Sequence, residues 1–74
     1  MKFNKNTTDA QKSAYELGKK AYHNGITCAP FYDRALDPLY KGVTAKEHAA
    51  ISKAWSWGFM EVYHAATSNL LETN

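Results

Sequence analysis

Lysine and aromatic side chains near the N-terminus are the residues best suited to binding chemistry. Lys12, Lys19 and His23 are spaced so that they share one face of a helix, with Lys20 and Tyr22 beside them. Lysines neutralise phosphates and tyrosines stack on unpaired bases, so a basic face of this kind is typical of RNA binding. The same spacing is typical of a solvated outer face, which periodicity alone favours.

A second group of candidate binding residues lies in the middle of the chain, where aromatic and leucine side chains are dense. Exposed tyrosines suit the centre of a protein interface, and one exposed tryptophan would be a further anchor. The residues of this protein-interaction surface would be Phe31, Tyr32, Leu39, Tyr40 and Trp57. In an RNA-binding protein the same segment would instead supply Arg34 for phosphates and Tyr32 for stacking.

Metal and catalytic chemistry fit this sequence poorly. Four metal-ligating side chains occur at none of the spacings of known zinc sites: His23, His48, His64 and Cys28. We expect the single cysteine, Cys28, to be a small buried thiol, because a two-helix domain offers little concave surface for a nucleophile. Asp33 and Asp37 could pair as acid and base, but both are natural turn or capping residues. We therefore expect no catalytic, metal or cofactor site.

The size and composition of the chain narrow the range of functions. Its 74 residues form one small domain, and 45% hydrophobic and 14% aromatic residues indicate a folded one. A net charge of +2 with a single arginine is weak for a dedicated nucleic-acid binder. We expect a cytoplasmic protein away from membranes, because the sequence has neither an export signal nor a long apolar run. The small core favours help from a partner or from a second copy in a homodimer.

A capping box formed by Thr8 and Gln11 predicts a helix over residues 9–24. Gly25 supplies the residue that tolerates the left-handed conformation after the last turn. Four small residues form a stripe that would let another backbone approach closely: Ala14, Gly18, Ala21 and Gly25.

A second capping box, Thr44 with Glu47, predicts a longer helix over residues 45–67. The apolar stripe of this core helix consists of Ile51, Trp55, Gly58, Val62 and Ala65. We expect this stripe to pack on the small stripe of the first helix, with Gly18 and Gly58 allowing close contact.

The linker over residues 26–43 lacks a helical period. Asp37 as cap and Pro38 at the first helical position predict a single turn that ends at Gly42. The apolar side chains of the linker indicate that it is packed rather than a free tether.

The remaining residues are an N-terminal arm, 1–7, and a tail, 68–74, in which we expect Leu70 and Leu71 to fold back. No strand alternation or repeat competes with this organisation. The sequence therefore predicts an all-α fold, a two-helix hairpin with a packed linker that contains a short helical turn.

Two blocks of the chain resemble the ribosome modulation factor family and its small relatives on plasmids and phages. The blocks are Gly18-x-x-Ala21-x-x-x-Gly25 with Cys28, Pro30 and an aromatic residue, and Trp55-x-x-Gly58-Phe59-x-Glu61. The resemblance implies a two-helix protein that binds the small ribosomal subunit near the messenger-binding region of its RNA and promotes inactive ribosome dimers. The chain departs from the family in an extra residue after Cys28, in a longer linker and in the absence of an arginine-rich surface.

Two hypotheses for the function follow. The first is a module that binds the ribosome or ribosomal RNA and lowers translation. Its RNA-binding residues would be Lys12, Lys19, Lys20, His23, Arg34, Tyr22 and Tyr32. The second is a phage- or plasmid-type module that binds and inhibits a host protein through the linker aromatics and Trp57. The resemblance favours the first hypothesis, and the low charge favours the second.

Overall fold

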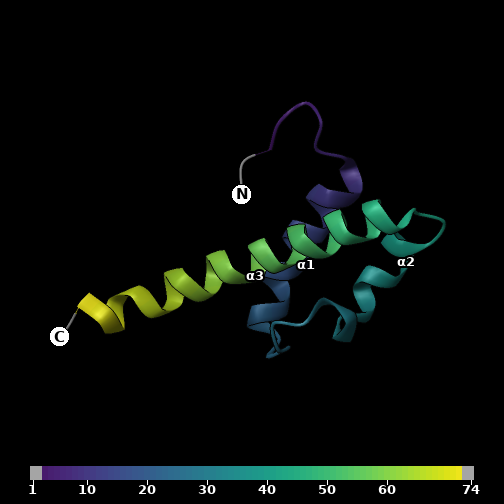
Figure 1. The fold of residues 1–74 in the computed structure, drawn as a ribbon. Helices are drawn as coiled ribbons and strands as arrows, with labels where there is room; N and C mark the ends of the chain where they lie inside the picture. The colour runs from purple at the N-terminus through teal and green to yellow at the C-terminus, as the bar shows by residue number, and fades with distance from the viewer. Residues whose placement is uncertain (1–2, 73–74) are drawn as a thin grey trace.

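Two long helices joined by a partly helical linker make up the fold. The computed structural model describes residues 3–72 and places side chains as far as Ser68. The elements in chain order are α1 Asp9–His23, η1 Pro30–Tyr32, η2 Arg34–Leu36, α2 Asp37–Tyr40 and α3 Ala45–Glu72 (Figure 1). The predicted all-α hairpin is confirmed, because α1 packs on α3 and the linker carries the short helix α2. Residues 1, 2, 73 and 74, in the expected arm and tail, lie outside the described residues.

α1 begins and ends through the caps that the sequence predicts. The Thr8 hydroxyl accepts from the Gln11 N–H at 3.1 Å, and the Gln11 side chain accepts from the Thr8 N–H at 3.4 Å. After the helix, Gly25 adopts a φ of +76°. This left-handed residue lets the Ile26 N–H reach back to the Ala21 carbonyl at 3.0 Å, which satisfies an end carbonyl.

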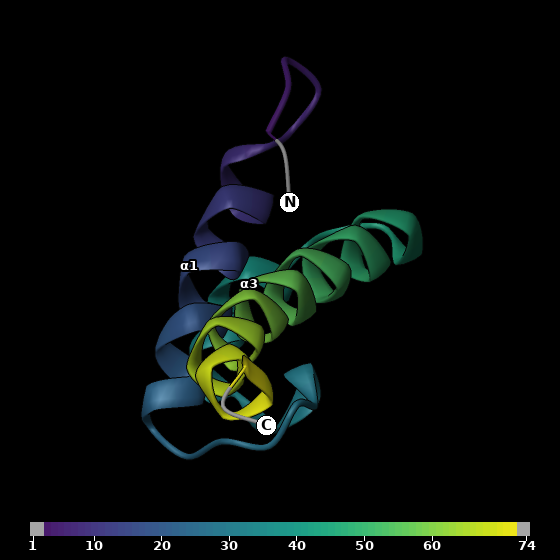
Figure 2. The same ribbon diagram turned by 90° about the vertical axis from the view of Figure 1, so that its left-hand side faces the viewer.

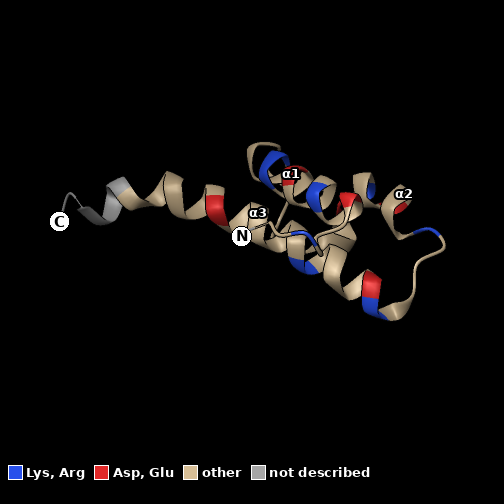
Figure 3. Ribbon diagram, turned by 90° about the horizontal axis from the view of Figure 1, so that it is seen from above, with Lys and Arg blue, Asp and Glu red and all other residues tan. Residues whose placement is uncertain are grey.

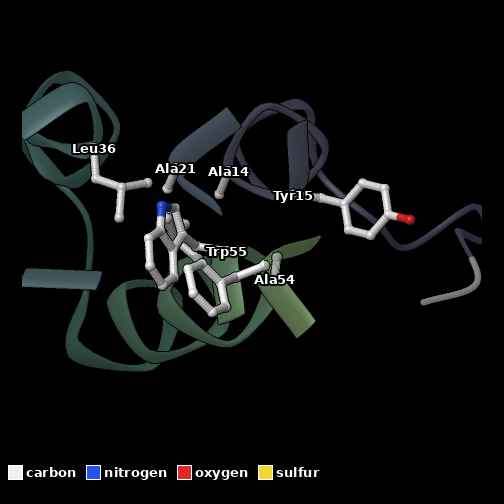
Figure 4. Packing of buried hydrophobic residues seen from close by; sticks show 8 residues of the cluster. Ala14, Tyr15, Ala21, Leu36, Ala54 and Trp55 are labelled. Carbon is white, nitrogen blue, oxygen red and sulfur yellow. The ribbon is translucent and has the colours of Figure 1, made fainter. Parts of the chain in front are cut away.

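α1 and α3 cross at two glycines (Figure 2). A Cβ added to Gly18 would collide with the backbone carbonyl of Trp55, and one added to Gly58 would collide with the carbonyl of Tyr15. The two backbones are therefore in direct contact, as the stripe of small residues predicted. The buried hydrophobic residues around this crossing are Ala14, Tyr15, Ala21, Leu36, Ile51, Ala54, Trp55 and Phe59 (Figure 4).

The linker folds as more helical turns than expected. Two 3₁₀ turns precede α2, and Asp37 is the first residue of α2 rather than its cap, because Leu36 already has helical backbone angles. Leu36 is completely buried, so the prediction of a packed linker is confirmed in this half. Gly42, with a φ of +76°, turns the chain after α2, and the Thr44 hydroxyl then caps α3.

α3 extends beyond the end that the apolar pattern predicted. It has 28 residues and reaches Glu72 rather than ending near Thr67. The Thr67 hydroxyl donates to the Tyr63 carbonyl at 2.9 Å and the Ser68 hydroxyl to the Ala65 carbonyl at 3.2 Å. Both hydroxyls are thus satisfied inside the helix. We expected residues 68–74 to form a tail that folds back, but the chain instead continues α3 as far as Glu72.

The C-terminal part of α3 projects past the end of α1 (Figure 1). The last aromatic contacts between the helices join the Tyr22 ring to Phe59 and Tyr63, at centroid distances of 5.6 and 6.3 Å. Ala65, which the sequence placed in the buried stripe, is exposed. Within residues 3–72, no helix combines the length and the hydropathy of a membrane-spanning segment.

Candidate functional site

The linker turn is fixed to the core by one buried carboxylate. Asp33 is 7% exposed, and one of its oxygens accepts from the Ala35 N–H at 3.0 Å, which caps η2. Its other oxygen accepts from the indole N–H of Trp55 at 2.7 Å. The sequence identified Asp33 as a turn residue, and that role is confirmed, but the contact with Trp55 was missed. The signal for it was the predicted burial of Trp55, because a buried indole N–H needs an acceptor.

This anchored segment presents two aromatic rings to solvent. Phe31 is 76% exposed and Tyr32 is 66% exposed, and their ring centroids lie 4.5 Å apart. Arg34 follows directly after Asp33 and is exposed as well. We call Phe31, Tyr32 and Arg34 the aromatic turn.

The lysines on the basic face of α1 differ in whether they form an ion pair. Lys19 is half-buried, lies 3.9 Å from Glu16 and sits over the Tyr15 ring at 4.8 Å from its centroid. Glu16 thus forms its ion pair with the lysine three residues further along the helix. Lys12 and Lys20 are exposed and form no ion pair within the described part of the chain, although the Lys12 ammonium lies over the Phe3 ring at 6.0 Å from its centroid. Basic residues, drawn in blue, recur along α1 in Figure 3.

The remaining RNA-binding candidates lie at the C-terminal end of α1. Tyr22 is half-buried, because its ring packs edge-on against Phe59 and Tyr63 of α3. His23 is exposed, with its ring edge-on to Tyr22 at a centroid distance of 5.7 Å. Tyr22 therefore contributes to the helix contact, and Tyr32 is the tyrosine of this set that presents most of its ring to solvent.

The expected protein-interaction residues do not form one surface. Tyr40 is half-buried, its hydroxyl lies 2.7 Å from the Ser52 hydroxyl, and its ring stacks on His48 at 3.8 Å. Trp57 is 43% exposed, with the Lys53 ammonium 5.2 Å from its ring centroid. Because Trp57 is two residues from the buried Trp55, it lies about 200° around α3, away from the core face.

A groove runs between α1 and the second half of the linker. It has a volume of about 410 Å³ and is open to solvent. Its lining residues are Lys12, Ser13, Glu16, Leu17 and Lys20 from α1 and Ala35, Pro38 and Leu39 from the linker. Leu39 is half-buried in it, so of the linker residues proposed for protein binding it alone belongs to this groove.

Cys28 is exposed, so the expectation of a buried thiol is wrong. The turn at Gly25 directs residues 27 and 28 away from the helix contact, and both are exposed there. Among residues 3–72, no cluster of three histidine, cysteine or acidic side chains could hold a metal ion.

The residues of the tryptophan block hold the hairpin together. The Trp55 indole binds Asp33, and Gly58 lies against the Tyr15 backbone. The Tyr15 hydroxyl donates to the Glu61 carboxylate, and this hydrogen bond, together with burial and nearby negative charge, raises the pKa of Tyr15 to about 12. The block thus accounts for the fold and leaves the binding surface to other residues.

Known proteins supply no further guide to the site. No protein-family model, curated protein or solved structure matches this chain. The resemblance to the ribosome modulation factor family therefore rests on the two sequence blocks alone.

Proposed function

We propose that this protein binds ribosomal RNA on the ribosome and lowers translation, in the manner that the resemblance to ribosome modulation factor implies. The aromatic turn carries the proposal. Phe31 and Tyr32 expose most of their rings on a segment that Asp33 anchors to the core, so they are positioned for stacking before any ligand binds.

Stacking on exposed rings is the usual way in which proteins hold unpaired bases. Each stacked base contributes about 1–3 kcal/mol, and the interaction tolerates different bases because every base has a π face. Arg34 is part of the same turn. Lys20 of α1 lines the groove together with Ala35, the residue that follows Arg34. These two cations would contact the phosphates that flank the stacked bases.

The low net charge sets the expected dependence on salt. Lys12, Lys20 and Arg34 are exposed and unpaired within residues 3–72. If all three contact phosphates of a single strand, the logarithm of the affinity falls with the logarithm of salt concentration with a slope of about −2. Affinity would therefore depend more on stacking than on charge.

Co-sedimentation with purified ribosomal subunits over a salt series tests the proposal. Replacing both Phe31 and Tyr32 by alanine should weaken binding at least about 10-fold, because two stacking contacts are lost. The matched control is Trp57→Ala, which removes an exposed aromatic ring elsewhere and should leave binding unchanged. Absence of co-sedimentation at low salt, or an equal loss in the control, would contradict the proposal.

A second candidate function, inhibition of a host protein by direct binding, is favoured by one observation. The groove between α1 and the linker has an apolar floor formed by Leu17, Pro38 and Leu39. Apolar side chains are typical of the buried core of a protein interface, so such a floor suits a protein partner.

A further inference from the structure

We infer that the groove between α1 and the linker binds an acidic amphipathic helix of a partner protein. This surface goes beyond the proposed RNA binding, because Phe31 and Tyr32 do not line it, and it shares only Lys12 and Lys20 with the proposed phosphate contacts. Two features of the groove carry the inference: an apolar floor and cationic side chains along the rim that α1 forms.

The floor is apolar and comes from both walls. Leu17 of α1 and Leu39 of α2 are half-buried, and Pro38 and Ala35 continue the apolar surface between them. Half-buried leucines that face each other across an open groove leave apolar surface in contact with water. A partner covers such a floor best with apolar side chains of its own, spaced at three and four residues along a helix.

The rim of the groove is basic because its one acidic residue, Glu16, already forms an ion pair. Lys12, Glu16 and Lys20 follow one another at steps of four residues along α1. Glu16 lies 3.9 Å from Lys19, which offsets its charge. Lys12 and Lys20 form no ion pair within residues 3–72, so the rim presents two positive charges without an acidic partner, and the contact of Lys12 with the exposed Phe3 ring leaves its charge in place.

These two charges set the chemistry and the spacing of the partner. Lys20 follows Lys12 by eight positions of α1, a rise of about 12 Å along the helix axis. A partner helix lying along α1 would match them with acidic residues seven or eight positions apart. Its leucines, at positions between the two acids, would face Leu17 and Leu39. Charge complementarity of this kind selects an acidic helix over a basic one.

Selection from a randomised library of helical peptides tests the inference without assuming a sequence. The full-length protein is the bait, and selected peptides are titrated into ¹⁵N-labelled protein to map their site by NMR. We expect enriched peptides with leucines at three- and four-residue spacing and acids seven or eight positions apart. Their binding should shift the amide signals of Leu17, Lys20 and Leu39.

Charge reversal on the protein provides the decisive comparison. The double variant Lys12→Glu with Lys20→Glu should weaken a selected acidic peptide at least about 10-fold and should strengthen its counterpart in which lysines replace the acids. The matched control reverses Lys46 and Lys53, two exposed lysines of α3 that do not line the groove, and should change neither affinity. Leu39→Gln tests the floor, and denaturation curves confirm that each variant is folded.

The possible results separate the inference from its competitors. Selected peptides that are basic or neutral, peptides that shift signals elsewhere, or an equal loss in the Lys46 and Lys53 control would each overturn it. A single-stranded RNA oligonucleotide that shifts the same groove signals and displaces the peptide would assign the groove to RNA instead. Loss of RNA binding in the Phe31 and Tyr32 variant, with peptide binding intact, would show that the groove binds the peptide without the aromatic turn, as the inference requires.

Discussion

The helix crossing and the linker turn are held in opposite ways. At the crossing, Gly18 and Gly58 bring two backbones into contact, and a single added carbon collides with a carbonyl group. In the linker, one carboxylate and one leucine, Asp33 and Leu36, are buried, while Phe31 remains in solvent. The crossing depends on two positions without a side chain, whereas the turn depends on a buried leucine and on a carboxylate that accepts two hydrogen bonds.

This difference separates the residues that maintain the fold from those available for binding. Substitution at the crossing changes the distance between α1 and α3, whereas substitution of Phe31 or Tyr32 leaves every buried contact in place. The exposed residues of the linker can therefore change without loss of the hairpin. Of the residues that resemble ribosome modulation factor, Gly18, Trp55 and Gly58 lie at the buried contact, whereas Cys28 is exposed.

The largest effect is expected where the backbones touch. Gly18→Leu should destabilise the protein by about 3 kcal/mol, at the upper end of the range for overpacked contacts, because the obstacle is backbone that no rotamer change can move. Chemical denaturation followed by circular dichroism measures the change. Ala49→Leu, on an exposed position of α3, is the control and should stay within about 0.5 kcal/mol of the parent. An unchanged midpoint for Gly18→Leu would mean that the helices do not meet there.

A smaller effect is expected from separating the turn from the core. Asp33→Ala removes the acceptor of both the Ala35 N–H and the Trp55 indole, and should cost about 2 kcal/mol because the indole N–H stays buried without a partner. Asp33→Asn keeps one acceptor oxygen and should cost less. Fluorescence of Trp55 during denaturation, in a background with Trp57→Phe, reports on this contact directly. Equal costs for both variants would show that the indole bond does not contribute.

The smallest effect distinguishes two tyrosines of the linker. Tyr40→Phe removes the hydroxyl that meets Ser52 and should cost about 1 kcal/mol, whereas Tyr32→Phe removes an exposed hydroxyl and should cost almost nothing. Thermal unfolding of the two variants side by side makes the comparison. A larger loss at Tyr32 would mean that the aromatic turn is packed and unavailable to a ligand.

The parts of the fold that follow from neighbouring residues could be predicted from the sequence. The Thr8 cap, the left-handed Gly25 and the close approach at Gly18 each depend on local spacing or on a periodic face. The bond between Asp33 and Trp55 joins residues 22 apart, and no period connects a turn residue with a core residue at that distance. This contact depends on where the folded chain places the two side chains, which residue type alone does not determine.

The candidate site was predictable to a similar degree. Residue type and helical spacing placed Lys12 and Lys20 correctly on an outer face. Nothing in the sequence showed that Phe31 would be exposed while Tyr40 would pack on His48, because both are aromatic residues of one aperiodic segment. The groove depends on how α2 lies against α1, which is a property of the assembled chain.

The projecting end of α3 has a consequence for hydrodynamic measurements. The molecule extends 47 × 27 × 15 Å, and its radius of gyration is 13.2 Å. A compact chain of this length would have a radius of gyration of about 11 Å. The monomer should therefore diffuse more slowly than a sphere of its mass and elute early from a gel-filtration column, at the position of a larger protein. Early elution is thus expected both for an elongated monomer and for a homodimer. Light scattering, which measures mass, distinguishes the two.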